Sequence, residues 1–410
     1  MKNAFDMLEE RGFIQQMSHE DEIRELLAKE KITLYVGIDP TSSSLHIGHI
    51  YPIMVMAHMQ KMGHRPIIVV GGGTAMVGDP SGKSEMRKML TQEDIAQNKI
   101  GIKKQLEHIL DFSDGKALMV DNADWLMALE YVPFLREIGS QFSVNRMLAA
   151  DAFKTRMERP EGGLSFLELN YMIMQSYDFL HLYKTYDCKM QIGGDDQWSN
   201  ILAGTDLIRR VERGSAYALT LPLLLTASGQ KMGKTEQGAV WLDPELTSPY
   251  EFYQYWRNID DLDVKRYMNV YTFFEIDEIE ALTSEQADIN EAKKTLAHFI
   301  TSLIHGQEEA DQAAQAAAAL FEGEGDLSHV PTTEISLNRL KEGINILDLL
   351  QECQLIVSKS EGRRLIKQGG IRLNKVAVKE FERLVTDQDL QSGSLLLNKG
   401  KKVFHRVLPV

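Results

Sequence analysis

The fold of the first half of this chain is decided by Thr33-Leu34-Tyr35-Val36-Gly37-Ile38, a short apolar stretch, together with the residues up to Val70. His46-Ile47-Gly48-His49 precedes a second apolar run, Ile50 to Met62, and Pro66 to Val70 is a further short apolar stretch. Strand, helix and strand in this order form a βαβ unit, which predicts a parallel sheet. His46–His49 then lie where the first strand turns into the helix, and backbone N–H groups and the helix dipole favour a bound anion there.

Two later stretches extend the predicted sheet. Ala117 to Asp121 follows a long helical stretch, Glu93 to Leu110, and Lys189 to Ile192 leads into Gly193-Gly194-Asp195-Asp196-Gln197. Each strand ends in a loop rich in glycine or aspartate, and ligands of open α/β sheets bind at the carboxyl ends of the strands. The sequence therefore predicts an α/β domain whose ligand site lies over these loops.

The second half of the chain has a different character. Thr247 to Ala318 is predicted to be mostly helical, and Gly323 to Pro331 has the glycine and proline content of a linker. The last block combines a helix at Ser360 to Gln368 with several short strand-like stretches. We expect an α/β domain at residues 1–222, a lysine-containing loop and a helical domain at 223–325, a linker at 326–344 and a small α+β domain at 345–410.

The charge of the chain is unevenly distributed. The 410 residues carry a net charge of −14, which argues against general, sequence-blind binding of nucleic acid. Residues 345–410, however, hold 12 Lys and Arg against 7 Asp and Glu, so they carry +5 while the remainder carries −19. A small basic block on an acidic body indicates a local contact with a polyanion.

Cysteine use and hydropathy suggest the compartment. Cys188 and Cys353 lie in different predicted domains, so we expect no disulfide framework, and a reducing, cytoplasmic setting fits. Residues 1–11 are acidic and lack the apolar core of a signal peptide. No apolar stretch approaches the roughly 18 residues of a membrane helix, so we expect no membrane span. Neither cysteine has neighbours typical of a metal site or a catalytic dyad.

Three segments carry residues suited to phosphate groups. Gly78-Asp79-Pro80-Ser81-Gly82-Lys83-Ser84 is similar to a P-loop, but Val77 occupies the position of its first glycine, so we exclude a P-loop. Lys83 and Arg87 are then either solvated charges or mobile phosphate contacts. Lys231-Met232-Gly233-Lys234-Thr235 places two ammonium groups in a glycine-containing loop, where they can follow a moving phosphate charge, although any flexible loop can have this spacing.

The imidazoles of His46 and His49 have two interpretations. Both can face one phosphate group, or they are surface histidines at a capped helix start. Together with Lys231–Thr235 they indicate an enzyme that handles ATP phosphates, because phosphoryl and nucleotidyl transfer depend on charge stabilisation around developing oxyanions.

A polar face on a predicted helix indicates a pocket. Tyr171, Gln175 and Asp178 are spaced by four and three residues, so they share one helical face among apolar neighbours. They form either a pocket for a small amphiphilic ligand or a solvated polar stripe. In Gln191–Gln197 two glycines permit close approach of a flat or sugar-like ligand, and Asp196 can accept from ribose hydroxyls, although an ordinary strand-to-helix turn has a similar composition.

These motifs resemble those of a known family. The chain is similar over nearly its whole length to the bacterial tyrosyl-tRNA synthetases, and residues 358–370 resemble an S4 RNA-binding domain. The matching segments, in chain order, are Leu34–Thr41, His46–His49, Gly78–Gly82, Tyr171–Gln175, Gln191–Gln197, Lys231–Thr235 and Ser248–Tyr253. The resemblance implies a class I synthetase with a Rossmann-like catalytic domain containing a connective region for dimer formation, then an α-helical anticodon-binding domain and an S4 module. It further implies a cytoplasmic homodimer that uses L-tyrosine, ATP with Mg²⁺ but no dedicated protein metal site, and tRNA(Tyr).

The resemblance also assigns roles to individual residues. At the tyrosine site it implies Tyr35 and Asp178 at the phenol, Asp79, Tyr171 and Gln175 at the ammonium group, Gln197 near the carboxylate, and Gly37, Asp39 and Gln191 as further contacts. At the ATP site it implies Thr41 and His46 at the γ-phosphate. It implies His49, Gly194 and Asp196 at the ribose, with Gly48 beside the nucleotide. The residues that it places over the pyrophosphate are Lys83, Arg87, Lys231, Lys234 and Thr235. RNA binding falls on Lys359, Arg363, Arg364 and Lys367.

Two rival functions are compatible with parts of the pattern. A tryptophanyl-tRNA synthetase has related motifs, but the pair Tyr35 and Asp178 favours a phenol over an indole. A paralogue that binds RNA without catalysis would keep the fold, but the intact Thr41, His46 and Lys231 argue for a working enzyme.

Overall fold

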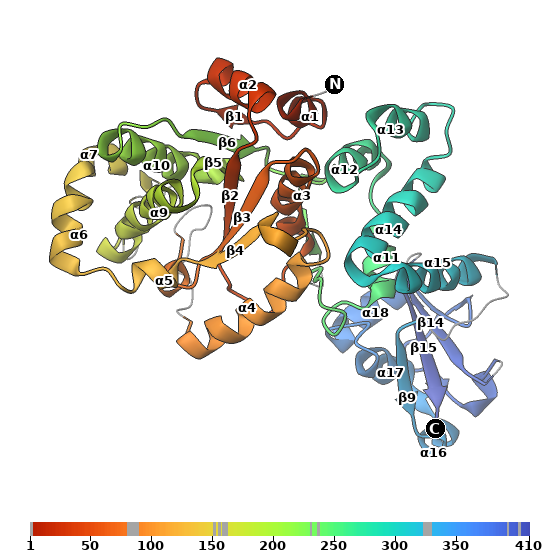
Figure 1. The fold of residues 1–410 in the computed structure, drawn as a ribbon. Coiled ribbons are helices and arrows are strands. Elements are labelled where there is room, and N and C mark those ends of the chain that lie inside the picture. Colours follow the sequence, from red (N-terminus) through yellow and green to blue (C-terminus); the bar gives the residue numbers. More distant parts are fainter. Residues whose placement is uncertain are drawn as a thin grey trace. The chain divides into compact units, whose positions relative to one another are not determined.

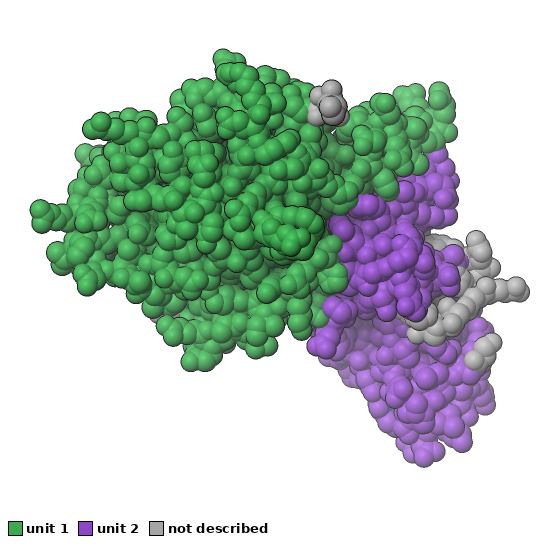
Figure 2. Space-filling model, viewed as in Figure 1, with its two compact units in different colours: residues 1–243, 260–287 green, residues 244–259, 288–410 purple. Residues whose placement is uncertain are grey.

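The computed structural model divides by its internal contacts into two compact units, residues 1–243 with 260–287 and residues 244–259 with 288–410 (Figures 1 and 2). Each unit has its own sheet and its own apolar core. The residues that the structure describes are 3–79, 90–150, 153–154, 157, 163–229, 232–235, 238–322, 330–391, 393–400 and 403–410, with only the backbone described at 234–235 and 319–322.

The first unit is built on a six-stranded sheet with the strand order β1-β6-β5-β2-β3-β4. The strands from β6 to β4 are parallel, and the short edge strand β1 is antiparallel to β6. The predicted parallel sheet is therefore confirmed. Its strands are β1 (Gln16–Met17), β2 (Thr33–Ile38), β3 (Arg65–Val70), β4 (Leu118–Asp121), β5 (Cys188–Gly194) and β6 (Tyr217–Leu221).

The central strand β2 presents different residues to the two faces of the sheet. Side chains alternate along a strand, so Tyr35, Gly37 and Asp39 point to one side. This is the side of α9 (Phe166–Tyr186), because the Tyr35 ring lies 5.2 Å from the ring of Phe179. Figure 1 shows α9 and α10 (Trp198–Val211) on one side of the sheet, and α3 (Ile47–Lys61) and α4 (Gln92–Leu106) on the other.

Residues 260–287 belong to the first unit although they follow a segment of the second. The buried guanidinium of Arg11 donates to the backbone oxygens of Asn269, at 2.8 Å, and Thr272, at 3.1 Å. These bonds fix the C-terminal end of α12 (Val264–Tyr271). The remaining elements of the unit are α1 (Ala4–Glu10), α2 (Glu20–Lys29), α5 (Ala123–Leu126), α6 (Tyr131–Glu137), α7 (Val144–Leu148), α13 (Ile276–Leu282), β7 (Lys234–Thr235) and β8 (Gly238–Ala239), with short 3-10 turns at Thr74–Met76, Ser113–Gly115, Gly139–Gln141, Asp195–Gln197 and Asp261–Asp263.

The second unit combines a helical part with a small sheet. Helices α11 (Pro249–Arg257), α14 (Ile289–His305) and α15 (Gln307–Glu322) pack together. The sheet has the order β12-β11-β14-β15-β9, antiparallel except for the parallel pair β15 and β9. Its other elements are β9 (Thr332–Ile335), α16 (Leu337–Glu342), β10 (Ile344–Asn345), α17 (Ile346–Glu352), α18 (Lys359–Lys367), β11 (Ile371–Leu373), β12 (Val376–Ala377), β13 (Leu384–Val385), β14 (Leu395–Lys399) and β15 (Val403–Pro409), with a 3-10 turn at Asp387–Asp389.

The stretch 326–344 differs from the expected linker. Residues 332–335 form β9, which is paired with β15, and residues 337–342 form α16. The buried side chains of Ile335 and Leu340 belong to the core of the C-terminal sheet. This stretch is therefore structurally part of the C-terminal domain from residue 332 onward. Among the residues described, the structure has no helix with the length and apolarity that crossing a membrane requires.

Candidate active site

Polar side chains of β2, β5 and α9 meet at the face of the sheet where Tyr35 contacts Phe179, and they define the candidate pocket of this site. Tyr35 on β2 is the register partner of Gln191 on β5, and both side chains are buried. Gly37 follows on the same face, and a Cβ at this position would meet nothing within 4 Å. The strand thus lines a space that its glycine leaves open.

Asp178 is a buried and strongly perturbed group of this pocket. Its side chain is only 4% exposed, and its two carboxylate oxygens accept from Asn122 Nδ2 at 2.9 Å and from Trp125 Nε1 at 2.7 Å. Burial raises the pKa of Asp178 to about 7, and the two hydrogen bonds oppose the shift only in part. The carboxylate is therefore held in a fixed orientation next to Tyr35, on which its charge acts directly.

Asn122 and Trp125 are site residues that the sequence interpretation missed. Both residues follow β4 in the chain. Ligands of open α/β sheets bind at the carboxyl ends of the strands, so the rule that pointed to the ends of β2 and β5 also covers the end of β4. Asn122 additionally donates to Thr74 Oγ1 at 3.0 Å, and its amide oxygen accepts from Gly73 N at 2.8 Å. It thus ties the turn after β3 to Asp178.

Three buried side-chain atoms of the pocket have no hydrogen-bond partner within the described part of the protein. They are the hydroxyl of Tyr35, Oε1 of Gln175 and Oε1 of Gln191. Buried polar atoms without partners are unfavourable in a folded protein by about 1–3 kcal/mol each, so their concentration here indicates groups arranged for a ligand. Burial, followed by the charge of Asp178, raises the pKa of Tyr35 well above its ordinary value, so its hydroxyl stays protonated.

The alternative of a solvated polar stripe on α9 is wrong. Tyr171 and Asp178 are buried, and Gln175 is half-buried. The Tyr171 hydroxyl donates to Asp39 Oδ2 at 3.1 Å, and the other oxygen of Asp39 accepts from Thr74 Oγ1 at 2.9 Å. The helix therefore contributes its polar face to the pocket.

Asp79 and Gln197 form a second polar pair in this unit. Asp79 is buried, and its Oδ2 accepts from Gln197 Nε2 at 2.9 Å. Gln197 in turn accepts from Asn200 Nδ2 at 3.3 Å. The structure thus brings together two residues that are 118 positions apart in sequence. The family resemblance assigns Asp79 to the ammonium group of the bound tyrosine and Gln197 to its carboxylate.

The two histidines cap α3 and stack on each other. His46 Nδ1 accepts from Gly48 N at 3.1 Å, His49 Nδ1 accepts from His46 N at 3.2 Å, and the ring centroids are 3.9 Å apart. A neutral imidazole that accepts at Nδ1 carries its proton on Nε2. The capping interpretation is therefore correct, and it also fixes both rings as Nε2 donors, the form that suits an anionic ligand.

The histidine turn lies directly against the second phosphate-type segment. Gly233 has a positive φ of 90°, and a Cβ there would lie 3.0 Å from Ile47 Cγ1 and 3.2 Å from Gly48 N. Ile47 N also donates to Val240 O at 3.0 Å, just beyond β8. Two motifs about 190 residues apart in sequence thus share one location.

The two aspartates in the loop after β5, Asp195 and Asp196, have different environments. Asp195 Oδ1 accepts from Gln16 Nε2 at 2.7 Å and from Thr220 Oγ1 at 3.1 Å, so Asp195 fastens the loop to β1 and β6. Asp196 is exposed beside Gly194. Thr41 is also exposed, and its backbone N–H donates to Asp39 O at 2.8 Å.

Several predicted phosphate contacts lie outside the described part of the chain. Lys83, Arg87 and Lys231 are among them, and of Lys234 and Thr235 only the backbone in β7 is known, where it pairs with β8. The predicted RNA-binding residues lie on α18. Lys359 pairs with Asp348, and Arg363 lies over the ring of Phe381. Lys359, Arg364 and Lys367 are exposed, as is Arg363.

This arrangement defines a class of protein. A polar pocket at the carboxyl ends of a parallel sheet, beside a turn of two stacked histidines, is the architecture of a class I aminoacyl-tRNA synthetase. Residues 27–322 match the family described as tRNA synthetases class I (W and Y), and residues 322–407 match the tyrosine–tRNA ligase SYY-like C-terminal domain.

Relatives with high sequence identity to the chain are tyrosine–tRNA ligases. The chain is 59% identical to the tyrosine–tRNA ligase of Acetivibrio thermocellus and 56% identical to that of Clostridium perfringens, over 99% and 100% of each chain. A C-terminally truncated mitochondrial tyrosyl-tRNA synthetase from Aspergillus nidulans is similar in structure, with a TM-score of 0.71 at 29% identity over 78% of this chain and 95% of that one. The chain belongs to the tyrosine–tRNA ligase family.

Proposed function

We propose that the chain activates L-tyrosine with ATP to tyrosyl-adenylate and pyrophosphate, then transfers tyrosine to the 3′ end of tRNA(Tyr). The observation that carries the tyrosine specificity is the pair of Asp178, buried with an elevated pKa, and Tyr35, whose buried hydroxyl has no partner in the described part of the protein. A phenol has one donor and one acceptor on a single oxygen. It can donate to the Asp178 carboxylate and accept from Tyr35, so it satisfies both groups at once.

The same two groups account for rejection of phenylalanine. A ligand without the phenol leaves the Tyr35 hydroxyl buried and unpaired, which is unfavourable by about 1–3 kcal/mol, and it leaves Asp178 with only its donors Asn122 and Trp125. An indole N–H could satisfy Asp178 but would offer no acceptor to Tyr35. The pocket therefore favours tyrosine over phenylalanine and tryptophan.

The chemistry of the first step requires positioning more than proton transfer. The tyrosine carboxylate is already a nucleophile for the α-phosphorus of ATP, so no general base is needed. We propose that Asp79, Tyr171 and Gln175 hold the ammonium group, with Gly37, Asp39 and Gln191 shaping the pocket. Gln197, held by Asp79, then lies near the reacting carboxylate.

We propose that the nucleotide lies over the histidine turn. His46 and Thr41 would stabilise the γ-phosphate, and the fixed Nε2–H donor of His46 supports this role. The ribose would lie on Gly194, Asp196 and His49, with Gly48 allowing close approach. Mg²⁺ would arrive with ATP as part of the substrate. Closure over the pyrophosphate would fall to Lys83, Arg87, Lys231, Lys234 and Thr235.

We further propose that tRNA is held by regions outside the catalytic domain. The boundaries near residues 222 and 325 remain predictions, as does an anticodon-binding role for the helices between them. The exposed basic residues of α18 support an S4-type contact with RNA. We also expect the protein in the cytoplasm, where tRNA is charged.

A homodimer is supported by an exposed apolar surface. Several large apolar side chains along the chain from α5 to the start of α9 are exposed, and they include Val132 and Phe166, which are 71% and 67% exposed. Light scattering should give twice the chain mass of 46.4 kDa, and Phe166→Asp should shift the mass toward the monomer.

Tyrosine-dependent exchange of pyrophosphate into ATP tests the proposed reaction. We expect exchange with tyrosine and none above background with phenylalanine. Exchange with tryptophan instead of tyrosine would refute the assigned specificity. A folded protein that supports no exchange but binds tRNA would identify an RNA-binding paralogue.

A further inference from the structure

The indole of Trp125 links the selecting carboxylate to a histidine one turn further along α9. Its Nε1 donates to Asp178 Oδ1 at 2.7 Å. Its ring is stacked on the imidazole of His181, with 4.3 Å between the centroids and 16° between the planes. Since Asp178 and His181 are three residues apart, they lie on the same face of the helix, and the indole spans both.

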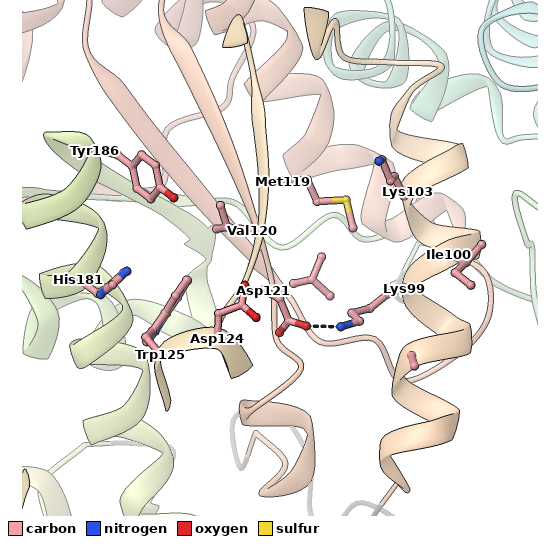
Figure 3. Close-up of a pocket in the computed structure, with 12 residues that line it drawn as sticks. Lys99, Ile100, Lys103, Met119, Val120, Asp121, Asp124, Trp125, His181 and Tyr186 are labelled. Atoms are coloured by element: carbon pink, nitrogen blue, oxygen red, sulfur yellow. Dashed lines mark hydrogen bonds and ion pairs between the residues drawn. The ribbon is translucent and has the colours of Figure 1, made fainter. Parts of the chain in front are cut away.

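On another side, Trp125 borders open space. It lines a cavity of about 510 Å³ together with His181, Tyr186, Lys103, Asp124 and other residues of α4 and β4 (Figure 3). Packed neighbours hold a side chain in one rotamer, and a cavity wall lacks them. The stacked imidazole therefore supplies a restraint that close packing would otherwise provide.

His181 suits this role as a neutral ring. Its partial burial lowers its pKa, and the nearby Lys184 acts in the same direction, so the imidazole is uncharged at neutral pH. It needs no counter-ion, and its flat face can lie on the indole without a desolvated charge. Aromatic pairs of this kind stabilise a structure beyond the area that they bury.

We propose that His181 is a positioning residue for tyrosine selection, which holds the Trp125 indole in the orientation that donates to Asp178. This inference rests on the proposed function. If the stack is lost, the indole can turn toward the cavity and Asp178 keeps only the Asn122 donor. The carboxylate then loses its fixed orientation toward the phenol, while the nucleotide turn at His46–His49 is untouched.

The effect on substrates should be selective. Loss of a hydrogen bond to a buried carboxylate corresponds to roughly tenfold weaker binding. His181→Ala should therefore raise KM for tyrosine about tenfold and reduce discrimination against phenylalanine, with an unchanged KM for ATP. His181→Phe preserves a flat ring and should restore values close to those of the parent protein.

Tyr186→Ala is the matched control, because Tyr186 lines the same cavity while the ring stacked on Trp125 is that of His181. It should leave tyrosine kinetics unchanged. The proposal is overturned if His181→Ala has no effect on tyrosine, if it raises both KM values equally, or if His181→Phe is as defective as His181→Ala.

A spectroscopic readout separates this proposal from the proposed function. The chain has four tryptophans, so the Trp125 indole N–H resonance can be assigned by its loss in Trp125→Phe. In His181→Ala this resonance should move upfield as the hydrogen bond to Asp178 weakens, and in Tyr186→Ala it should stay. An unmoved resonance in His181→Ala refutes the positioning role even if the parent protein does not activate tyrosine.

Discussion

Asp178→Asn should change both the stability and the substrate binding of the protein. The native carboxylate accepts from Asn122 Nδ2 and Trp125 Nε1. An asparagine amide has only one oxygen, so its NH₂ group must face one of these two donors. The variant therefore loses the charge that the phenol requires and gains a contact between two donors.

The magnitude on stability follows from the pKa of Asp178. Its folded value is about 7, against 3.8 without the protein environment. Because the folded state prefers the protonated acid, the stabilisation is fully present below about pH 4 and is lost as the pH rises to about 7. Three pKa units correspond to about 4 kcal/mol over the whole range, of which about 3 kcal/mol falls between pH 5 and pH 8.

Urea unfolding of the parent protein and the variant at pH 5 and pH 8 measures this difference. The parent protein should lose about 3 kcal/mol more than Asp178→Asn between these two values. Asp124→Asn, which changes an exposed carboxylate in the same region, should behave like the parent. In exchange assays, Asp178→Asn should raise KM for tyrosine by about 10–100-fold and leave KM for ATP nearly unchanged. Equal pH dependence in all three proteins, or an equal loss of tyrosine and ATP affinity, would refute the reasoning.

Three further predictions concern the nucleotide and the tRNA. Gly233→Ala places a Cβ against Ile47 at a φ of 90°. Adenylation measured by single-turnover kinetics should therefore slow by about tenfold or more, while the KM for tyrosine is retained. An unchanged rate would contradict the close contact. Lys234→Ala should lower the adenylation rate with little change in tyrosine affinity, and a parent-like rate would exclude the phosphate clamp. The double variant Arg363→Ala with Arg364→Ala should preserve pyrophosphate exchange but weaken tRNA binding. The number of ions released on tRNA binding, measured from the salt dependence of the affinity, should fall by about two. Intact charging and an unchanged salt dependence would exclude this contact.

The sequence was sufficient for the catalytic sheet because local patterns dominate there. Thr33–Ile38 was predicted as a strand and is β2 with the same bounds, since it is mostly apolar and its larger side chains, Leu34, Tyr35, Val36 and Ile38, are buried. The start of α3 was placed three residues late, at Ile50, because His46 acts as an unusual N-cap. β9 was missed, because Thr332–Ile335 is an edge strand of mostly polar, exposed residues, so nothing in its composition distinguishes it from a linker.

The pocket was only partly predictable, for a different reason. Helical spacing alone grouped Tyr171, Gln175 and Asp178. The donors of Asp178, however, are 53 and 56 residues away in sequence, and only tertiary structure brings them to the carboxylate. Likewise, the sequence does not distinguish Asp195 from the adjacent Asp196. The hydrogen bonds of Asp195 with Gln16 and Thr220 give it a structural role, and these bonds are visible only in the folded protein.

The elevated pKa of Asp178 leads to a final prediction, that tyrosine binding releases protons. At pH 7 the free carboxyl group is about half protonated, because its pKa is about 7. A phenol that donates to the carboxylate stabilises the ionised form, lowers the pKa and expels the remaining proton. Calorimetric titration with tyrosine in buffers of different ionisation enthalpy should therefore detect a release of about half a proton per site at pH 7, less at pH 8 and more at pH 6. Asp178→Asn should abolish this component. Proton uptake at pH 7 would mean that the protonated acid donates to the phenol oxygen, and would reverse the assigned roles of Asp178 and Tyr35.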